Sequence, residues 1–377
     1  MTQAVQSPAA TATRSSGDQK LKFHASEGFL SELKKRVDDY FHQTGRPRRD
    51  CPQMYFKTAT IFTAFTAAYI LLLFFAASWW TVVPLAIILG LGIAAIGFNI
   101  QHDGGHKAYS DRPWVNKLMS LTIDLIGGSS YLWAWKHNTF HHTFTNVAGH
   151  DDDISIGILG RLSPHQPRYS FHRFQCVYLW FLYGFLALKW HLVDDFLNVA
   201  TGRVGSHKIP RPRGTELLIF IGGKVAFFSL AFVIPMLLHP IWIVLSVYAF
   251  AAFISGVVMS VVFQLAHCVE DAAFPEPVLA PDGGQRMNTD WAVHQVLTTV
   301  DFARGNRLLC WFLGGLNFQV EHHLFHGICH IHYPALSKLV EEVCHDFGIR
   351  YAAQKSFFSA VASHFRWLVA MGRPSAT

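Results

Sequence analysis

Three histidines stand close together in the sequence HNTFHH, which covers residues 137–142. On an α-helix, side chains four residues apart share a face and lie about 5–6 Å apart. We therefore expect His137 and His141 to point at one spot, while His142, about 100° further round the helix, reaches a neighbouring spot. Imidazole is a common metal ligand, and this spacing fits two metal ions held near each other. A histidine-rich polar surface helix is the alternative that this stretch alone leaves open.

Histidines cluster in three further places among the 22 of the chain. HDGGH covers residues 102–106, QLAH ends at residue 267, and QVEHH covers residues 319–323. Together with HNTFHH, these places supply eight candidate metal ligands: His102, His106, His137, His141, His142, His267, His322 and His323. Eight imidazoles exceed what one metal ion binds, so we predict two metals. Imidazole suits iron, copper, zinc and nickel alike, and ligand type alone does not choose between them.

The elements that must position these histidines are membrane helices. Of all residues, 51% are hydrophobic and only 15% are charged, against about 25% charged in soluble domains. Thr58–Gln101 has no charged residue, and in Leu217–Phe263 the only Lys or Arg is Lys224. Because a membrane helix needs about 20 apolar residues, each run is long enough for two. We predict an all-α integral membrane protein with four transmembrane helices in two hairpins, at about 58–79, 82–100, 217–238 and 240–263.

The lysines and arginines predict the orientation of these hairpins. All 31 lie outside the two hairpin turns, and only Lys224 lies within a hairpin. By the positive-inside tendency, both hairpins enter from the cytoplasm and return to it. All four histidine clusters and both termini are then cytoplasmic. The clusters form a helical His-rich catalytic cap on a multi-pass membrane protein. If the source is bacterial, the membrane is the inner membrane. The net charge of +6 fits anionic membrane lipid or an acidic partner, and no motif indicates nucleic acid.

The remaining segments complete the predicted organisation. Residues 1–20 are a disordered tail, 21–57 a cytoplasmic or interfacial segment whose amphipathic helix could lie on the membrane, 58–370 the membrane domain and 371–377 a tail. Two shorter apolar stretches, Leu118–Trp135 and Cys176–Trp190, are expected to be interfacial or buried rather than crossing. Lys224 is expected to snorkel to the cytoplasmic interface. The six cysteines form no C-x-x-C pair and are expected to be reduced.

The order H-D-x-x-H, H-x-x-x-H-H and Q-x-x-H-H, set around two membrane hairpins, resembles the membrane-bound fatty acid desaturases. The glutamine that opens the third box is typical of their front-end (Δ5/Δ6-type) group. Further stretches are similar to the bacterial and cyanobacterial Δ6-type enzymes: GGSSY at 127–131, WAVHQVLTTVDF at 291–302, GGLN at 314–317 and CHIHYP at 329–334. The resemblance covers roughly residues 50–370. The H-P-G-G motif of a fused cytochrome b5 domain does not occur in the sequence.

The resemblance implies a non-haem di-iron centre with the eight histidines as ligands. Gln319 stands where other desaturases have a histidine, so it is a possible weak ligand. Asp103 and Glu321 are possible weak ligands or supports, and Asp151 could orient an imidazole through its far nitrogen. A solvated acidic face is the alternative for residues 151–153. His326 stands where relatives have proline and is not expected to be a ligand. Seven others are expected to be structural or surface groups: His150, His165, His172, His191, His294, His330 and His332.

The resemblance further implies an O2-dependent enzyme that introduces a cis double bond into a fatty acyl chain carried as acyl-CoA or acyl-lipid. No flavin, haem or iron–sulfur motif occurs, so electrons would come from an external ferredoxin- or cytochrome b5-type donor. The membrane helices and neighbouring segments are expected to supply the acyl channel, which Tyr131, Trp133, Trp135 and Trp180 could line or border. Three alternatives stay open. They are a Δ9-type desaturase, a membrane di-iron hydroxylase of lipids or alkanes, and a non-catalytic metal carrier.

Overall fold

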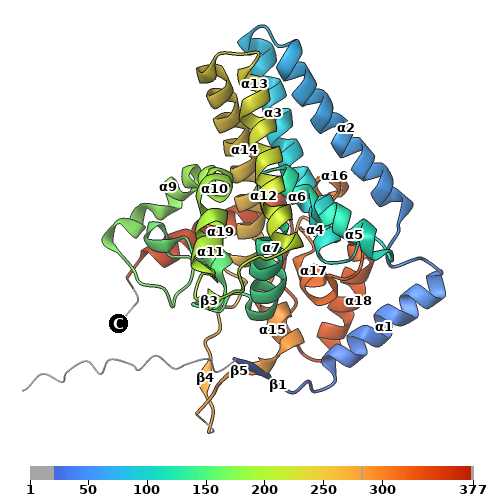
Figure 1. Cartoon of the computed structure of the whole chain (residues 1–377). Coiled ribbons are helices and arrows are strands. Elements are labelled where there is room, and N and C mark those ends of the chain that lie inside the picture. The colour runs from blue at the N-terminus through green and yellow to red at the C-terminus, as the bar shows by residue number, and fades with distance from the viewer. Residues whose placement is uncertain (1–20, 282, 375–377) are drawn as a thin grey trace, which may run out of the picture.

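The computed structural model describes residues 21–281 and 283–374. Four helical spans in this part are long and apolar enough to cross a membrane: Pro52–Phe74, Trp79–Gly105, Thr215–Met236 and Ile241–His267. They rise together from a larger helical body (Figure 1). The predicted tail 1–20 and residues 375–377 of the predicted C-terminal tail lie outside the described residues. The four-helix prediction is confirmed, although the first helix begins and ends several residues earlier than expected.

The two hairpins turn where the sequence favours a break. Pro52 occupies the first turn of the first helix, where its missing N–H costs nothing. The second helix begins at Trp79 behind a Ser78–Thr81 capping box. The spans comprise α2 (Pro52–Phe74); α3 (Trp79–Ala95), η1 (Ile96–Gln101) and α4 (His102–Gly105); α12 (Thr215–Phe228), η7 (Ser229–Val233) and α13 (Ile234–Met236); and α14 (Ile241–His267).

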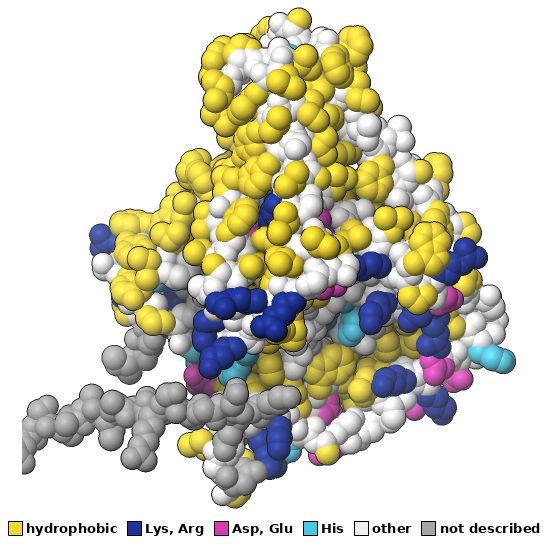
Figure 2. Space-filling view, viewed as in Figure 1, with side chains coloured by type: hydrophobic (Ala, Val, Ile, Leu, Met, Phe, Trp, Pro, Cys, Tyr) yellow, Lys and Arg dark blue, Asp and Glu magenta, His cyan; other side chains and the backbone are white. Residues whose placement is uncertain are grey.

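The hairpins pack closely through a small residue. A Cβ on Gly90 of α3 would lie 2.5 Å from the Ala251 carbonyl oxygen of α14. Small residues of this kind let helix backbones approach in a membrane. Hydrophobic side chains cover the upper part of the molecule, where these helices rise, and Lys and Arg gather in a band below it (Figure 2).

The stretch predicted at Cys176–Trp190 forms part of a sharply bent helix pair. Ser170–Leu182 and Phe185–Thr201 meet at 75°. At the bend, Gly184 packs under the Phe253 ring, which a Cβ would meet at 2.1 Å. The pair comprises η5 (Ser170–Phe174), α9 (Gln175–Leu182), α10 (Phe185–Lys189), η6 (Trp190–Asp194) and α11 (Asp195–Thr201). The other short stretch is divided among α5 (Pro113–Ser120), α6 (Thr122–Leu125) and α7 (Ser130–Trp133).

Lys224 is buried and paired within the protein, whereas the snorkelling prediction expected it to reach the interface. Its side chain is 6% exposed, and its Nζ donates to Asp195 Oδ2 at 2.7 Å and to the Gly127 carbonyl at 2.6 Å. Asp195 also accepts from the Trp190 indole at 2.9 Å. A buried charge needs a partner, and the bent helix pair supplies one that no local sequence pattern could indicate.

The apolar face of the amphipathic segment near the N-terminus is covered by protein and not by lipid. Helix α1 (Phe29–Thr44) begins only after Gly28, and Phe23 lies in strand β1 (Lys22–His24). The apolar face of α1, made by Phe29, Leu33 and Val37, is buried against α18 (Tyr333–Asp346). An amphipathic pattern predicts a covered face but not whether lipid or protein covers it.

The rest of the body consists of short elements around the hairpin ends. The helices are η2 (Ala134–His141), α8 (His142–Phe144), η3 (Asp152–Ile154), η4 (Gly157–Leu159), α15 (Trp291–Thr298), α16 (Arg307–Phe312), α17 (Gln319–Phe325), η8 (His330–His332) and α19 (Phe357–Gly372). Strand β5 (Gln285–Asp290) pairs with β1 in parallel and with β4 (Val278–Leu279) antiparallel. Two further pairs are β2 (Arg203–Val204) with β3 (His207–Lys208), and β6 (Asp301–Phe302) with β7 (Ala353–Gln354). All six cysteines are free, as predicted.

Candidate metal centre

The first histidine box lies on the last turn of the second span. Helix α3 continues through the π-helix η1 into α4, which carries His102, and His106 follows directly. The two glycines of HDGGH make room for neighbouring segments. A Cβ on Gly105 would lie 2.2 Å from the Trp133 ring, and one on Gly104 would lie 2.6 Å from the Ser120 backbone nitrogen. The box can therefore sit directly against α5 and α7.

An α-helix was expected for the stretch HNTFHH. It lies instead in and just after the π-helix η2. Its i→i+5 pattern brings residues five apart together, and Nε2 of His137 lies 3.2 Å from Nε2 of His142. The ring of His141 lies further round, against His267 and His323. The expectation of two neighbouring spots is retained. His137 adjoins His142, and it also stacks on His141 with centroids 5.3 Å apart and shares a candidate group with His141 and Asp153.

Four histidines from three segments form the first histidine group: His102, His106, His137 and His322. Their candidate ligand nitrogens all lie within 4.8 Å of one another. Nε2 of His102 and Nε2 of His137 are 3.2 Å apart. The ring of Trp133 stacks on His137 with centroids 4.7 Å apart and closes one side of the group.

Three more histidines form the second histidine group: His141, His267 and His323. All three are fully buried. The amide of Gln319 adjoins this group, with Nε2 2.8 Å from His267 Nε2 and 3.3 Å from His323 Nε2. A half-turn of the amide about its bond to the side chain places its oxygen toward the same nitrogens. The geometry thus brings Gln319 to the position of a weak ligand.

His142 joins the two groups. Its ring nitrogen lies within 4.8 Å of candidate nitrogens of both His322 and His323. All eight predicted ligands therefore converge on one double site at the ends of α4, η2, α14 and α17. His326 packs its ring against His106 and His142, with centroids 5.0 and 5.1 Å away. Among the described residues, none of the candidate metal-binding groups includes it.

The site fits metal because several buried imidazole nitrogens have no hydrogen-bond partner. Among the eight predicted ligands, these are His106 Nε2, His141 Nε2, His142 Nδ1, His267 Nδ1, and both ring nitrogens of His322. Buried polar atoms are nearly always paired in native proteins. Orphan nitrogens that face one another at ligand distance fit a pair of metal ions, and imidazole is an accepted ligand for iron.

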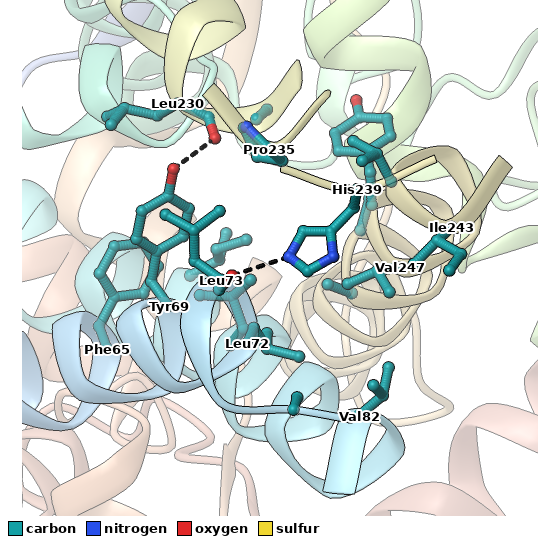
Figure 3. A pocket seen from close by; sticks show the side chains of 18 of the residues that line it. Phe65, Tyr69, Leu72, Leu73, Val82, Leu230, Pro235, His239, Ile243 and Val247 are labelled. Atoms are coloured by element: carbon teal, nitrogen blue, oxygen red, sulfur yellow. Dashed lines mark hydrogen bonds between the residues drawn. The ribbon is translucent and has the colours of Figure 1, made fainter. Parts of the chain in front are cut away.

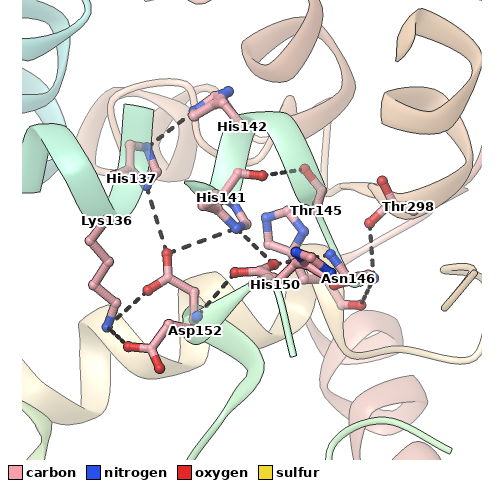
Figure 4. A network of polar contacts seen from close by, with 12 residues as sticks. Lys136, His137, His141, His142, Thr145, Asn146, His150, Asp152 and Thr298 are labelled. Atoms are coloured by element: carbon pink, nitrogen blue, oxygen red, sulfur yellow. Dashed lines mark hydrogen bonds and ion pairs between the residues drawn. The ribbon is translucent and has the colours of Figure 1, made fainter. Parts of the chain in front are cut away.

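Carboxylates hold the far side of the imidazoles in HNTFHH (Figure 4). His141 Nδ1 donates to Asp151 Oδ2 at 3.0 Å, so its Nε2 is free to face the second group. The Asp153 carboxylate lies 3.9 Å from His137 Nδ1 and 3.0 Å from Lys136 Nζ. Asp151 is 2% exposed. The solvated acidic face is therefore excluded for Asp151, and its predicted role in orienting an imidazole fits the geometry.

Burial and neighbouring charge act in opposite directions on these histidines. Burial among other imidazoles lowers the pKa of His106, His142, His322 and His323, and burial lowers the pKa of His137 to about 4. Burial also disfavours charge on His141, but the negative charge and hydrogen bond of Asp151 outweigh it and raise its pKa. Neutral imidazole is the form that binds metal, so most of the site is ready for metal at neutral pH.

Asp103 and Glu321 do not support the predicted ligands. Asp103 Oδ2 accepts from Nδ1 of His330 at 2.9 Å, and Glu321 accepts from the Tyr351 hydroxyl at 3.0 Å. Both carboxylates are hydrogen-bonded to residues outside the two histidine groups although each adjoins a box histidine in the sequence. Neighbouring residues on a helix face different directions, which is why adjacency in sequence misled the prediction here.

Two supporting residues were missed. Nδ1 of His323 lies 2.8 Å from Gln295 Oε1 and 3.2 Å from the Thr145 hydroxyl. Gln295 belongs to the family-like stretch 291–302, which was the only signal available for it. Several of the remaining histidines bind backbone carbonyls, as expected for structural groups: His165 to Phe274, His172 to Ile158, His294 to Thr145 and His332 to Pro47. Trp180 packs on His364, away from the site.

A family model described as fatty acid desaturase matches residues 77–355, which include every histidine of the double site. The chain belongs to the fatty acid desaturase family. It is 39% identical over 359 residues to an sn-1 linoleoyl-lipid 6-desaturase of Synechocystis sp., covering 95% of this chain and 99% of that protein. A protein of the same name from Arthrospira platensis is also 39% identical, over 93% of this chain and 95% of that protein.

A third relative widens the comparison. The acyl-lipid (8-3)-desaturase of Physcomitrium patens is 36% identical over 369 residues, which are 95% of this chain and 76% of that protein. The family assignment confirms the predicted resemblance. This desaturase is an oxidoreductase of lipid metabolism, and a non-catalytic metal carrier is excluded.

Proposed function

We propose that this desaturase binds two irons, one at the first histidine group and one at the second, with His142 between them. The observation that carries the proposal is the convergence of eight histidines from four separate segments on one buried site. Desaturases generally use a di-iron centre, and imidazole nitrogens without other partners fit that use. Such a centre supplies O2-dependent removal of hydrogen from an unactivated acyl carbon.

The balance of the reaction defines what the chain must do. Two hydrogens leave neighbouring acyl carbons and a double bond forms; these two hydrogens, together with two electrons from the donor and two protons, reduce O2 to two waters. Asp151 fixes the ring of His141, and Gln295 and Thr145 fix that of His323. The stacked ring of Trp133 excludes water beside His137. A dry, pre-oriented site is what this chemistry requires.

We further propose a front-end acyl-lipid desaturase that forms a cis double bond counted from the carboxyl end, similar in position to a Δ6 enzyme. The names of the Synechocystis and Arthrospira relatives, which match nearly end to end, support this choice. The Q-x-x-H-H box supports it as well. Δ9-type desaturation and lipid or alkane hydroxylation are the competing outcomes.

Electrons would come from an acidic donor of the ferredoxin or cytochrome b5 type. The exposed cations Lys107, Arg112, Arg203 and Arg211 belong to the segments between the hairpins, and the Lys and Arg band in Figure 2 lies below the apolar part. Opposite charge steers such encounters. By the positive-inside tendency, we infer that this band, both termini and the double site are cytoplasmic.

The test is product analysis in a host that lacks the activity. Total lipids of cells expressing the chain would be analysed by gas chromatography and mass spectrometry, with derivatives that locate double bonds. A new cis double bond near the carboxyl end is expected. A hydroxylated product, or a double bond only at the Δ9 position, would overturn the proposal. His141→Ala is the matched inactive control and is expected to remain in the membrane.

A further inference from the structure

Lys57 is a buried charge in the first membrane span, and no step described so far uses it. It lies on α2 and is 1% exposed. A polar side chain of a membrane bundle can be satisfied by a backbone carbonyl, as Figure 3 shows for the Tyr69 hydroxyl, which donates to the Leu230 carbonyl at 2.8 Å. The ammonium group of Lys57 instead lies 2.9 Å from Nε2 of His330, a side chain outside the four spans. This contact links the first span to the body of the molecule.

Lys57, His330 and Asp103 form a linear chain of hydrogen bonds. Because an ammonium group can only donate, Nε2 of His330 accepts from Lys57 and the ring proton is on Nδ1. Nδ1 donates to Asp103 Oδ2 at 2.9 Å, and the backbone N–H of His330 donates to the same oxygen at 3.3 Å. Burial lowers the pKa of His330, which fits a neutral ring. The neutral imidazole thus joins a buried cation to a buried carboxylate, and each charge has the partner that burial demands.

The chain ends inside the first histidine box. Between His102 and His106 stand only Asp103, Gly104 and Gly105, so the Asp103 side chain is the one handle by which a neighbour can hold this turn apart from the ligands themselves. Neighbouring positions on a helix are about 100° apart. Asp103 supports no ligand imidazole directly. A fixed Asp103 side chain sets the rotation of α4 about its axis, and with it the directions of both imidazoles.

The turn needs such a hold because it is the end of a helix. α4 ends at Gly105, and Lys107 already has a positive φ of 60°. Helix ends fray unless other contacts hold them. The other end of the chain is itself fixed, since Lys57 lies on a long span and its Nζ is 5.2 Å from the centroid of the Trp311 ring. The chain therefore ties the terminal turn of the second span to the first span.

We propose that Lys57 and His330 are positioning residues for the first histidine group. Acting through Asp103, they hold the turn that carries His102 and His106 in the orientation that metal binding requires. The inference rests on the proposed function, because it concerns the metal assigned to that group. His330, which the sequence placed among structural or surface groups, thereby has a defined role at the metal centre.

Three variants test the chain, and a fourth is the matched control. Lys57→Met keeps a long side chain but removes the charge and the donor. His330→Phe removes both ring hydrogen bonds, whereas the amide of His330→Gln keeps a donor and an acceptor. The control is Lys224→Met, which breaks a second buried lysine pair. Lys224 is bonded to Asp195 and Gly127 and not to the first histidine box.

The first measurement is hydrogen exchange of the backbone amides of residues 102–108 in metal-free protein. Lys57→Met and His330→Phe are expected to exchange about tenfold faster than the wild type, because a hydrogen bond to a charged group contributes at least this factor. His330→Gln should lie closer to the wild type than His330→Phe. Lys224→Met should exchange like the wild type in this segment, although its midpoint of thermal unfolding falls.

The second measurement is a chelator titration of iron-loaded protein. Lys57→Met and His330→Phe should release one iron at a chelator concentration about tenfold lower than the wild type, while the other iron is released as in the wild type. The midpoint of thermal unfolding is recorded for every variant. Lys224→Met should keep both irons as the wild type does, because a general loss of stability does not single out one metal.

Two results would overturn the proposal. One is wild-type exchange of residues 102–108 in both Lys57→Met and His330→Phe. The other is release of both irons together in these variants, with the same exchange and unfolding midpoint as Lys224→Met, because that pattern shows lost stability alone. The two variants break different links, so either one suffices if the other does not fold. Fewer than two irons in the wild type would instead contradict the proposed function, while exchange in the metal-free protein still decides the role of the chain.

Discussion

The carboxylate of Asp151 offers a sharp test of how the protein holds its metal. Asp151 accepts three hydrogen bonds, from His141 Nδ1 at 3.0 Å, from the Asn146 backbone at 2.9 Å and from the Asp153 backbone at 3.0 Å. In Asp151→Asn, one of the two oxygens is replaced by a donor. If the nitrogen takes the place of Oδ2, His141 Nδ1 and the Asn146 N–H both lose their acceptor, and if it takes the place of Oδ1, the Asp153 N–H loses its acceptor.

The size of the effect follows from these contacts. Replacing a group that orients a metal-bound imidazole commonly lowers metal affinity about 10–100-fold, which corresponds to roughly 1.4–2.8 kcal/mol. A buried donor without a partner costs a further ~1–3 kcal/mol of stability. The control is Asp152→Asn, because the Asp152 carboxylate is 30% exposed and lies 3.5 Å from Lys136. Exposed pairs of this kind contribute about 1 kcal/mol at most.

The assay is a chelator titration of purified protein in detergent, with iron per chain and the midpoint of thermal unfolding recorded together. Asp151→Asn should release iron at a chelator concentration at least about tenfold lower than the wild type, whereas Asp152→Asn should follow the wild type. Iron retention by Asp151→Asn equal to that of the wild type would refute the role assigned to this carboxylate.

Three further outcomes are expected. His141→Ala should abolish the product while the protein stays in the membrane, as measured by lipid analysis and immunoblotting; full activity would contradict the ligand assignment. Gly105→Ala should lower iron content and activity because its Cβ would meet the Trp133 ring at 2.2 Å, whereas Gly97→Ala, with no atom within 4 Å, should not. Lys224→Met should destabilise the protein by about 3–5 kcal/mol because the Asp195 carboxylate is left without its cation. Adding Asp195→Leu to this variant should restore most of the loss in the midpoint of thermal unfolding. Equal midpoints of Lys224→Met and the wild type would contradict the ion pair.

The membrane helices and the histidines could be predicted because both depend on composition over short stretches. An uncharged run such as Thr58–Gln101 has few stable places outside a membrane. His102, His106 and His267 directly follow those runs, and the predicted hairpin topology puts the other two histidine clusters on the same side. The structure adds which of them meet, and that depends on η2.

The errors share a physical cause, which is that sequence patterns describe an element but not its neighbour. An α-helical spacing was assumed for HNTFHH, and the π-helix makes His142 a close neighbour of His137 in addition to His141. The burial of α1 by α18 and the pairing of Lys224 with Asp195 join residues far apart in the chain. Asp103 was taken as a neighbour of His102, but it contacts His330, more than two hundred residues away in sequence.

The central claim is that the two histidine groups hold two irons, and it can be measured directly. Iron per chain and the Mössbauer spectrum would be recorded on protein purified from cells grown with labelled iron. The wild type is expected to contain about two irons per chain in nitrogen-rich, non-haem environments. His141→Ala, which removes a member of the second group, should retain about one. A wild-type content well below two, or an unchanged spectrum in His141→Ala, would contradict the account.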